Sequence, residues 1–219
     1  MTPSLKIKIC GITRSEDASV ACSLGVDLLG FNFVPVSKRY LNPYTAKAII
    51  DSLPPFISKV GIFADEELSV VNDLAGFLSL DAAQLHGKED VQYCRRVTIP
   101  VVKAVHVQGP EDLSGLEEYD VSAFLLDTKV EGELGGTGQT FPWEHAVDLC
   151  QKFRVIVAGG LTPDNVAEAV RTLSPYGVDT ASGVEISPGV KDADLMENFV
   201  RAARCAAAGN GGKCSGIAC

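Results

Sequence analysis

The sequence predicts a single α/β domain folded as a (β/α)₈ TIM barrel, and three observations support this. Eight short runs rich in β-branched and apolar residues alternate with eight stretches of helical pattern along the chain. The strand-like runs are apolar throughout rather than alternating, as expected of parallel strands buried on both faces. The length of 219 residues, with 46% hydrophobic and 21% charged residues, suffices for one barrel with a sizeable core.

Each expected strand is a short apolar run that ends beside a polar residue or a turn signal. The expected strands cover residues 5–10, 27–33, 58–64, 81–86, 100–107, 122–127, 153–159 and 178–182. The expected helices follow them one by one and cover residues 14–24, 43–53, 66–79, 88–97, 110–118, 142–151, 163–173 and 192–208. An open doubly wound sheet is the alternative, but it needs a GxGxxG turn after the first strand, where the chain has "CGITRSED".

Composition predicts the extent of the domain, the classes of partner it excludes and the cellular compartment. Residues 1–205 are expected to form the barrel, and the Gly- and Ala-rich residues 206–219 a flexible tail. A formal net charge of −9 argues against nucleic acid or an anionic membrane as partner. No secretory leader or membrane-length apolar run is recognisable. The seven cysteines are scattered without a CxxC pair or a neighbouring His, which predicts a reduced, cytoplasmic protein with no metal site.

Polar and reactive residues gather where the predicted strands end, which is where barrels carry their chemistry. These strand-end residues are Cys10, Asn32, Asp65, His86, His106 and Asp127. Two glycine turns follow the last two strands. Their candidate residues are Gly159 and Gly160 in "AGGLTP" and Ser182 and Gly183 in "ASGVE". Backbone N–H groups of such turns bind phosphate without a positive side chain, so we favour a phosphate site over two plain tight turns.

Asp127 ends the run "FLLD" and is followed by a long Gly- and Thr-rich segment. Gly135, Gly136, Thr137 and Gly138 are candidates for a lid loop, because so flexible a segment usually serves a function. A carboxyl group serves as a general acid near neutral pH only if its pKa is raised, and the preceding apolar residues favour partial desolvation. A helix cap or a surface turn is the alternative for Asp127.

Cys10 shares one face of the first strand with Lys6 and Lys8. If Cys10 faces the barrel mouth, Lys8 lies one layer below it, where a cation favours the thiolate. An inward lysine needs an acidic partner, because an unpaired buried charge is costly. Asp179 on the neighbouring eighth strand is the candidate partner. A buried, unreactive thiol is the alternative for Cys10.

Six motifs occur in one order along the chain, namely "KICGIT", "GFNFVPVSKRY", "QLHG", "LLDTKVEGELGGTGQTFPW", "VAGGLTPDNV" and "GVDTASGVEISPGVKD". Over residues 5–204 they resemble the phosphoribosylanthranilate isomerase family of tryptophan biosynthesis. The resemblance implies a barrel that catalyses an Amadori rearrangement without a cofactor, with Cys10 as general base and Asp127 as general acid. It also implies that Arg39 binds the anthranilate carboxylate. Gln84, His86 and Asp179 complete the expected substrate-binding set.

Some features depart from that family pattern or leave other functions open. Gln139 stands where the family commonly has Lys or Arg, and Ala181 where a hydroxyl is common; His106 and His145 are expected to be structural. The related histidine-pathway sugar isomerase uses an aspartate after the first strand, so Cys10 argues against it. A non-catalytic phosphosugar-binding barrel would be expected to have lost Cys10 or Asp127. The expected partners are a small phosphosugar substrate and other tryptophan-pathway enzymes.

Overall fold

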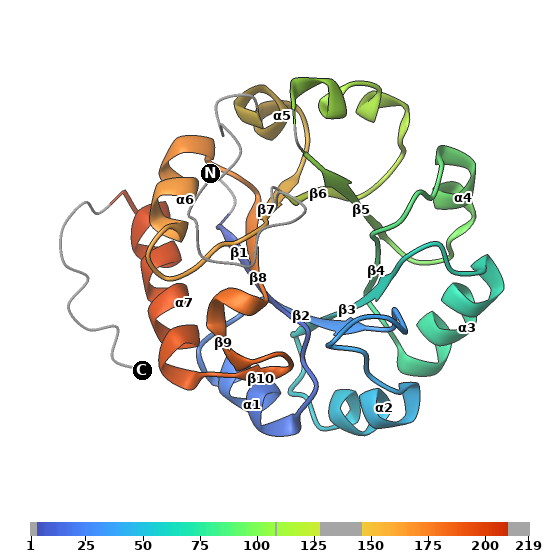
Figure 1. Ribbon diagram of the computed structural model, residues 1–219, viewed down its shortest axis with the longest axis horizontal. Coiled ribbons are helices and arrows are strands. Elements are labelled where there is room, and N and C mark those ends of the chain that lie inside the picture. Colours follow the sequence, from blue (N-terminus) through green and yellow to red (C-terminus); the bar gives the residue numbers. More distant parts are fainter. Residues whose placement is uncertain (1–3, 108, 128–145, 210–219) are drawn as a thin grey trace.

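The chain forms a closed ring of eight parallel strands in sequence order, in which β1 pairs with β8 (Figure 1). The computed structural model describes residues 4–107, 109–127 and 146–209. The strands are β1 (Lys6–Cys10), β2 (Leu28–Asn32), β3 (Ser58–Phe63), β4 (Ala82–Leu85), β5 (Val101–His106), β6 (Ala123–Asp127), β7 (Val155–Ala158) and β8 (Gly177–Thr180). All eight lie within or beside the predicted ranges, so the predicted (β/α)₈ barrel is confirmed.

Helices surround the ring on its outer side, as Figure 1 shows. They are α1 (Ser15–Ser23), α2 (Pro43–Asp51), α3 (Leu68–Leu78), α4 (Val91–Arg96), α5 (Val147–Lys152), α6 (Val166–Leu173) and α7 (Ala193–Ala207). The prediction of a helix over 110–118 is wrong, because two 3₁₀ turns, η1 (Pro110–Leu113) and η2 (Leu116–Glu118), occupy this connection. Gly115 separates them in the left-handed conformation, with φ +73°, which an α-helix cannot continue through. The first residues of the helix predicted over 142–151 lie outside the described part.

Both faces of the sheet are buried, which is why the strands read as unbroken apolar runs. The outward residues pack against the helices in the larger apolar cluster. A second, smaller cluster is built from alternate positions of β5, β6 and β7, and its buried members are Val102, Ala104, Ala123, Leu125, Ile156 and Ala158. Lys8, Gln84 and Asp179 are also buried, although they are polar. Buried polar groups require partners and are costly to place in a core. These three residues are therefore candidates for a functional role rather than a packing role.

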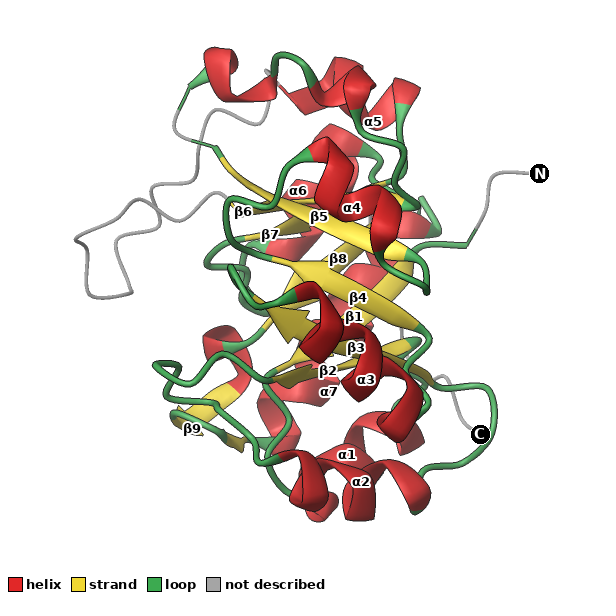
Figure 2. Ribbon diagram, turned by 90° about the vertical axis from the view of Figure 1, so that its right-hand side faces the viewer, coloured by secondary structure: helices red, strands yellow, loops and turns green. Residues whose placement is uncertain are grey.

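A small hairpin between β8 and α7 was not predicted. It follows the 3₁₀ turn η4 (Ser182–Val184) and consists of β9 (Glu185–Ser187) and β10 (Val190–Lys191). Figure 2 shows β9 outside one end of the barrel. Thr13 donates a hydrogen bond to the carbonyl of Gly189, and the Lys191 N–H donates to Asp17 at 3.1 Å. These bonds fasten the hairpin to the loop after β1 and to α1.

The last helix continues to Ala207, two residues past the boundary expected for the barrel, and residues 210–219 lie outside the described part. Cys10, Cys22, Cys94 and Cys150 are free thiols, as expected. Cys205 is disulfide-bonded instead, which corrects the expectation of reduced thiols at that position. Within the described ranges, no helix combines the length and the apolar character needed to cross a membrane.

Candidate active site

Cys10 ends β1 at the barrel mouth above a buried ion pair. Lys8 and Asp179 occupy paired positions of β1 and β8, and the Lys8 ammonium donates to Asp179 Oδ1 at 2.9 Å. This confirms the expected acidic partner of the inward lysine. Burial alone lowers the pKa of Lys8, but attraction to Asp179 and to Cys10 outweighs it and raises the pKa to about 12. Lys8 is therefore a permanent cation next to the candidate base.

Gly30 leaves room for the Cys10 side chain, because a Cβ at Gly30 would lie 3.0 Å from Cys10 Sγ. Burial raises the pKa of the Cys10 thiol above its ordinary value, Lys8 and Lys191 act in the opposite direction, and Asp179 adds to the rise. Burial is thus the largest of these effects, and it favours the neutral thiol over the thiolate. The two ammonium groups supply the field that favours the thiolate when the proton leaves.

Arg39, in the loop after β2, lies beside the first strand, since a Cβ at Gly11 would collide with its side chain. Its guanidinium is already engaged, with Nε 2.8 Å from Glu185 Oε1 and a terminal nitrogen 2.5 Å from Oε2. Burial alone raises the pKa of Glu185, but hydrogen bonds from Arg39 and Lys191 outweigh it and hold the pKa below its ordinary value. The predicted carboxylate-binding fork therefore holds an internal carboxylate.

Lys191 is a buried cation that the sequence analysis did not identify. Its ammonium donates to the Cys10 carbonyl at 2.5 Å, the Ala181 carbonyl at 3.1 Å and Glu185 Oε1 at 2.9 Å. Burial lowers its pKa, and Glu185 counteracts the effect. Lys191 thus joins the end of β1, the loop after β8 and, through Glu185, Arg39. Lys191 belongs to "SPGVKD", the end of the last family motif, but a strand as short as β10 cannot be predicted from sequence.

Asp127 ends β6 and lies next to His86, which follows β4. His86 Nε2 is 3.4 Å from Asp127 Oδ2, and Gln84 Nε2 is 3.0 Å from His86 Nδ1. Gln84 is buried, and its Oε1 has no hydrogen-bond partner within the described part of the chain. Gln84, His86 and Asp127 therefore form a continuous polar chain from the barrel interior to its mouth. The structure brings together three of the residues predicted for the site.

His106 belongs to this group, although we expected it to be structural. It is register-paired with Asp127, and its ring centroid lies 5.0 Å from that of His86. Its position at the end of β5 was a signal that could have assigned it to the site. Other strand-end residues shape loops instead: Asn32 Oδ1 accepts from the Val34 N–H at 2.8 Å, and Asp65 accepts from the Lys88 N–H at 2.6 Å. His145, Gln139 and the predicted lid residues Gly135, Gly136, Thr137 and Gly138 lie outside the described residues.

The two glycine turns lie together after β7 and β8. Thr180 Oγ1 donates to the Leu161 carbonyl at 2.7 Å, and a Cβ at Gly183 would collide with that same carbonyl. Gly159 and Gly160 have φ values of +85° and +72°, in the left-handed region that favours glycine. Close packing therefore requires glycine at 183, and backbone conformation favours glycine at 159 and 160.

Two backbone donors in these turns are available to a ligand. Among the described residues, no acceptor is found for the N–H groups of Gly160 and Gly183. Ser182 and Gly183 also begin η4, so their N–H groups precede the first bond of that turn. Such a group of donors is suited to an anion. The turns therefore have the character of the predicted phosphate cradle.

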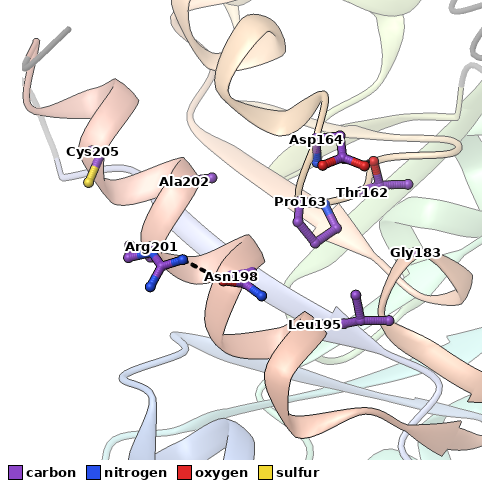
Figure 3. A pocket seen from close by; sticks show the side chains of 9 residues that line it. All are labelled: Thr162, Pro163, Asp164, Gly183, Leu195, Asn198, Arg201, Ala202 and Cys205. Carbon is purple, nitrogen blue, oxygen red and sulfur yellow. Dashed lines mark hydrogen bonds between the residues drawn. The ribbon is translucent and has the colours of Figure 1, made fainter. Parts of the chain in front are cut away.

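A separate groove of about 630 Å³ lies behind this cradle, between α7 and the turn after β7 (Figure 3). Its lining residues are Thr162, Pro163, Asp164, Gly183, Leu195, Asn198, Arg201, Ala202 and Cys205. Of these, Gly183 alone belongs to the predicted site. Arg201 is paired with Asn198 of the same helix rather than directed at the cradle. The groove is thus on the outer, helical side of the phosphate turns.

Comparison with known proteins places this geometry in a family. The model of the N-(5'-phosphoribosyl)anthranilate (PRA) isomerase family matches residues 7–202. The chain belongs to the PRA isomerase family. A PRA isomerase of Geobacter sp. (strain M21) is 51% identical over 199 residues, which are 91% of this chain and 98% of that protein. This identification sets aside the histidine-pathway alternative.

Solved structures of PRA isomerases agree with the fold as well. The enzyme from Thermotoga maritima has a TM-score of 0.86 at 40% identity and covers 91% of this chain and 98% of its own. Another PRA isomerase structure was solved in complex with reduced 1-(o-carboxyphenylamino)-1-deoxyribulose 5-phosphate; its TM-score is 0.82 at 38% identity, with the same coverage. The ligand in that relative is a phosphosugar that carries a carboxyphenyl group.

Proposed function

We propose that this protein converts N-(5-phosphoribosyl)anthranilate into 1-(2-carboxyphenylamino)-1-deoxyribulose 5-phosphate by an Amadori rearrangement, as a step of tryptophan biosynthesis. The observation that carries the proposal is that a member of the PRA isomerase family has a thiol, a carboxyl group and two glycine turns at the carboxyl ends of its barrel strands. We further propose the cytoplasm as its compartment and residues 1–205 as the catalytic unit. Other enzymes of the pathway are its proposed protein partners.

Asp127 is the proposed general acid. Protonation of the ribose ring oxygen by its carboxyl group breaks the bond from that oxygen to C1 and leaves an iminium at C1. The neighbouring imidazole of His86, 3.4 Å from Oδ2, supports this role because it can exchange a proton with the carboxylate after the step. Gln84 holds the imidazole from its other side at 3.0 Å, which fixes the ring orientation.

Cys10 is the proposed general base. Its thiolate removes the proton from the sugar C2, the C–H electron pair forms the C1–C2 double bond, and the iminium nitrogen takes up its electrons. The resulting enol then tautomerises to the ketone. Lys8 and Lys191 support this assignment, since both favour the thiolate. Their charges are fixed before the reaction, so they stabilise the thiolate without reorganisation until it takes up the C2 proton and becomes a neutral thiol.

Arg39 is the proposed binding residue for the anthranilate carboxylate, and the turns at Gly159, Gly160, Ser182 and Gly183 are proposed for the phosphate. Two nitrogens of the Arg39 guanidinium already donate hydrogen bonds to the two carboxylate oxygens of Glu185. A substrate carboxylate must therefore share or displace that partner, and the affinity gained is the difference between two charge-assisted contacts. This exchange supplies selectivity for substrates with a planar carboxylate.

The test is the decay of fluorescence of freshly prepared phosphoribosylanthranilate after addition of the purified chain. First-order loss of the signal, dependent on enzyme concentration, is expected with and without EDTA. Absence of turnover in a folded sample would overturn the proposed activity. Loss of turnover in EDTA would instead overturn the proposal that the reaction needs no metal.

A further inference from the structure

The carboxyl ends of β4, β5 and β6 bring two imidazoles and one carboxylate together. His86, His106 and Asp127 each offer one ligand atom, and these three atoms all lie within 4.8 Å of one another. Two of them are already close, with His86 Nε2 3.4 Å from Asp127 Oδ2. Within the part of the chain that the structure describes, no other group of three such residues meets this criterion.

One of these separations is close to what a metal ion requires, and the third ligand atom lies within 4.8 Å of the other two. Zinc binds imidazole nitrogen and carboxylate oxygen at about 2.0–2.2 Å in tetrahedral geometry, which places two ligand atoms about 3.3 Å apart. The separation of 3.4 Å between His86 Nε2 and Asp127 Oδ2 is close to this value. His106 is exposed at the end of β5, so its ring is free to rotate toward the other two. Two histidines and one carboxylate are a ligand set typical of zinc and of other divalent transition metals.

Gln84 provides the support that a metal-bound histidine needs. A histidine that binds metal through Nε2 donates its Nδ1–H to an outer acceptor, which fixes the tautomer. The Gln84 amide lies 3.0 Å from His86 Nδ1, and no described residue offers a hydrogen-bond partner to the buried Oε1 of the same amide. Because amide oxygen and nitrogen are interchangeable in position, turning the amide over gives the required Nδ1–H···Oε1 bond with the same number of hydrogen bonds.

We propose that His86, His106 and Asp127 form a binding site for a divalent transition-metal ion of the Zn²⁺ class, and that an ion bound there inhibits the isomerase. Metal coordination requires the carboxylate in its ionised form, so the bound ion removes the proposed general acid. The ion also occupies the side of the mouth where the sugar ring must bind. Inhibition is therefore competitive with substrate and is reversed by EDTA.

Binding is tested first without substrate, so that its outcome does not depend on the proposed activity. Zn²⁺ is titrated calorimetrically into the full chain in metal-free buffer, and Co²⁺ absorption reports the ligands. One ion per chain with a spectrum that lacks thiolate ligation is expected. His106→Gln should weaken this binding at least 10-fold, while His145→Gln, which removes the chain's third histidine, should leave it unchanged. Equal binding by His106→Gln and wild type would overturn the site, as would thiolate ligation or an equal loss in His145→Gln.

Two substitutions of Gln84 separate a metal-supporting role from a structural one. Gln84→Met removes the acceptor and should weaken Zn²⁺ binding by roughly 10–100-fold, the usual effect of losing an outer partner. Gln84→Glu supplies an acceptor in either orientation and should strengthen it. Changes of the same sign in both variants would overturn the assignment of Gln84.

In the activity assay, Zn²⁺ must raise KM in wild type and not in His106→Gln, each relative to its own metal-free baseline. Inhibition that persists in His106→Gln would show that the ion acts elsewhere.

Discussion

The Lys8 ammonium and the Asp179 carboxylate are 2.9 Å apart at paired positions of β1 and β8, the two strands whose pairing closes the barrel. The pair is buried directly below Cys10. The same two side chains therefore affect both the β1–β8 pairing that closes the barrel and the electrostatic environment of the candidate base. An alteration of either residue therefore affects stability and reactivity together, and experiments must separate the two effects.

Lys8→Met should slow the alkylation of Cys10 at every pH below its pKa. Burial already places that pKa above the ordinary value, so the alkylation rate should still be climbing above pH of about 8.5, where an ordinary thiol is half ionised. Loss of the Lys8 charge moves the rise to still higher pH. The measurement is the iodoacetamide reaction at Cys10, followed by mass spectrometry from pH 6 to 10.

Lys103→Met is the matched control, because Lys103 is also buried and lies 2.8 Å from Glu89. Breaking either pair is expected to cost about 3–5 kcal/mol of stability, since a charge is left uncompensated. Only the Lys8 variant should change the pH profile at Cys10. An identical shift in both variants would mean that the effect comes from loosened structure.

Asp127→Asn and Cys10→Ser should each lower kcat by roughly 10²–10⁴, the usual contribution of a positioned acid or base. Binding should change little in either, and the losses should not add in the double variant because the two steps are in series. Deuterium at the sugar C2 assigns the roles. Cys10→Ser should show a larger isotope effect than wild type; if Asp127→Asn shows the increase instead, the two roles are reversed.

Arg39→Ala should weaken substrate binding by at most about 1.5–3 kcal/mol, the value of a charge-assisted bidentate contact, because in the wild type the guanidinium gives up part of its pairing with Glu185 to bind the substrate. Lysine at this position should restore binding only in part, since it lacks the planar fork. KM values for the three proteins provide the measurement. Wild-type KM in Arg39→Ala would show that the anthranilate carboxylate is bound by another group.

Gly183→Ala should raise KM far more than it lowers kcat, because the phosphate is held in both the ground state and the transition state. The added Cβ collides with the Leu161 carbonyl and must displace the turn. Gly160→Ala meets open space but adopts a left-handed φ, so its main effect should be a stability loss of about 1–2 kcal/mol. Inhibition by inorganic phosphate, measured in both variants, reports on the cradle itself; unchanged KM in Gly183→Ala would remove this turn from the phosphate site.

Acid should destabilise the Arg39–Glu185–Lys191 network in a defined pH range. The pKa of Glu185 is held below its ordinary value, so its stabilising contribution is present above that ordinary value and is lost as pH falls through the lowered one. Glu185→Gln should therefore unfold with a weaker dependence on pH below about 4.5. Denaturant unfolding of both proteins between pH 3 and 7 provides the comparison, and parallel curves would contradict this role.

The strands and most helices were predictable because apolar periodicity depends on neighbouring residues alone. The Lys8–Asp179 pair was also predictable, since strand alternation directs Lys8 inward and closure brings β8 beside β1. The break at Gly115 was missed because one glycine within a helical pattern does not show whether the backbone takes a left-handed conformation.

The contacts around Arg39 were beyond sequence reasoning for a different reason. Arg39 and Glu185 are 146 positions apart, and their meeting depends on a hairpin with strands of two and three residues. Strands so short carry no recognisable periodicity. His106 is a different case: its place at the end of a predicted strand was visible in the sequence, and only its register with Asp127 across β5 and β6 was not.

The three bonds of the Lys191 ammonium have a consequence for how this enzyme can evolve. They connect the strand that ends in the candidate base, the turn that precedes the phosphate cradle and the carboxylate that holds Arg39. A substitution that adapts one end of the pocket to a new ligand therefore disturbs the other two. Adaptive paths to an altered substrate should be strongly epistatic, with changes at Arg39 and Glu185 tolerated only in combination.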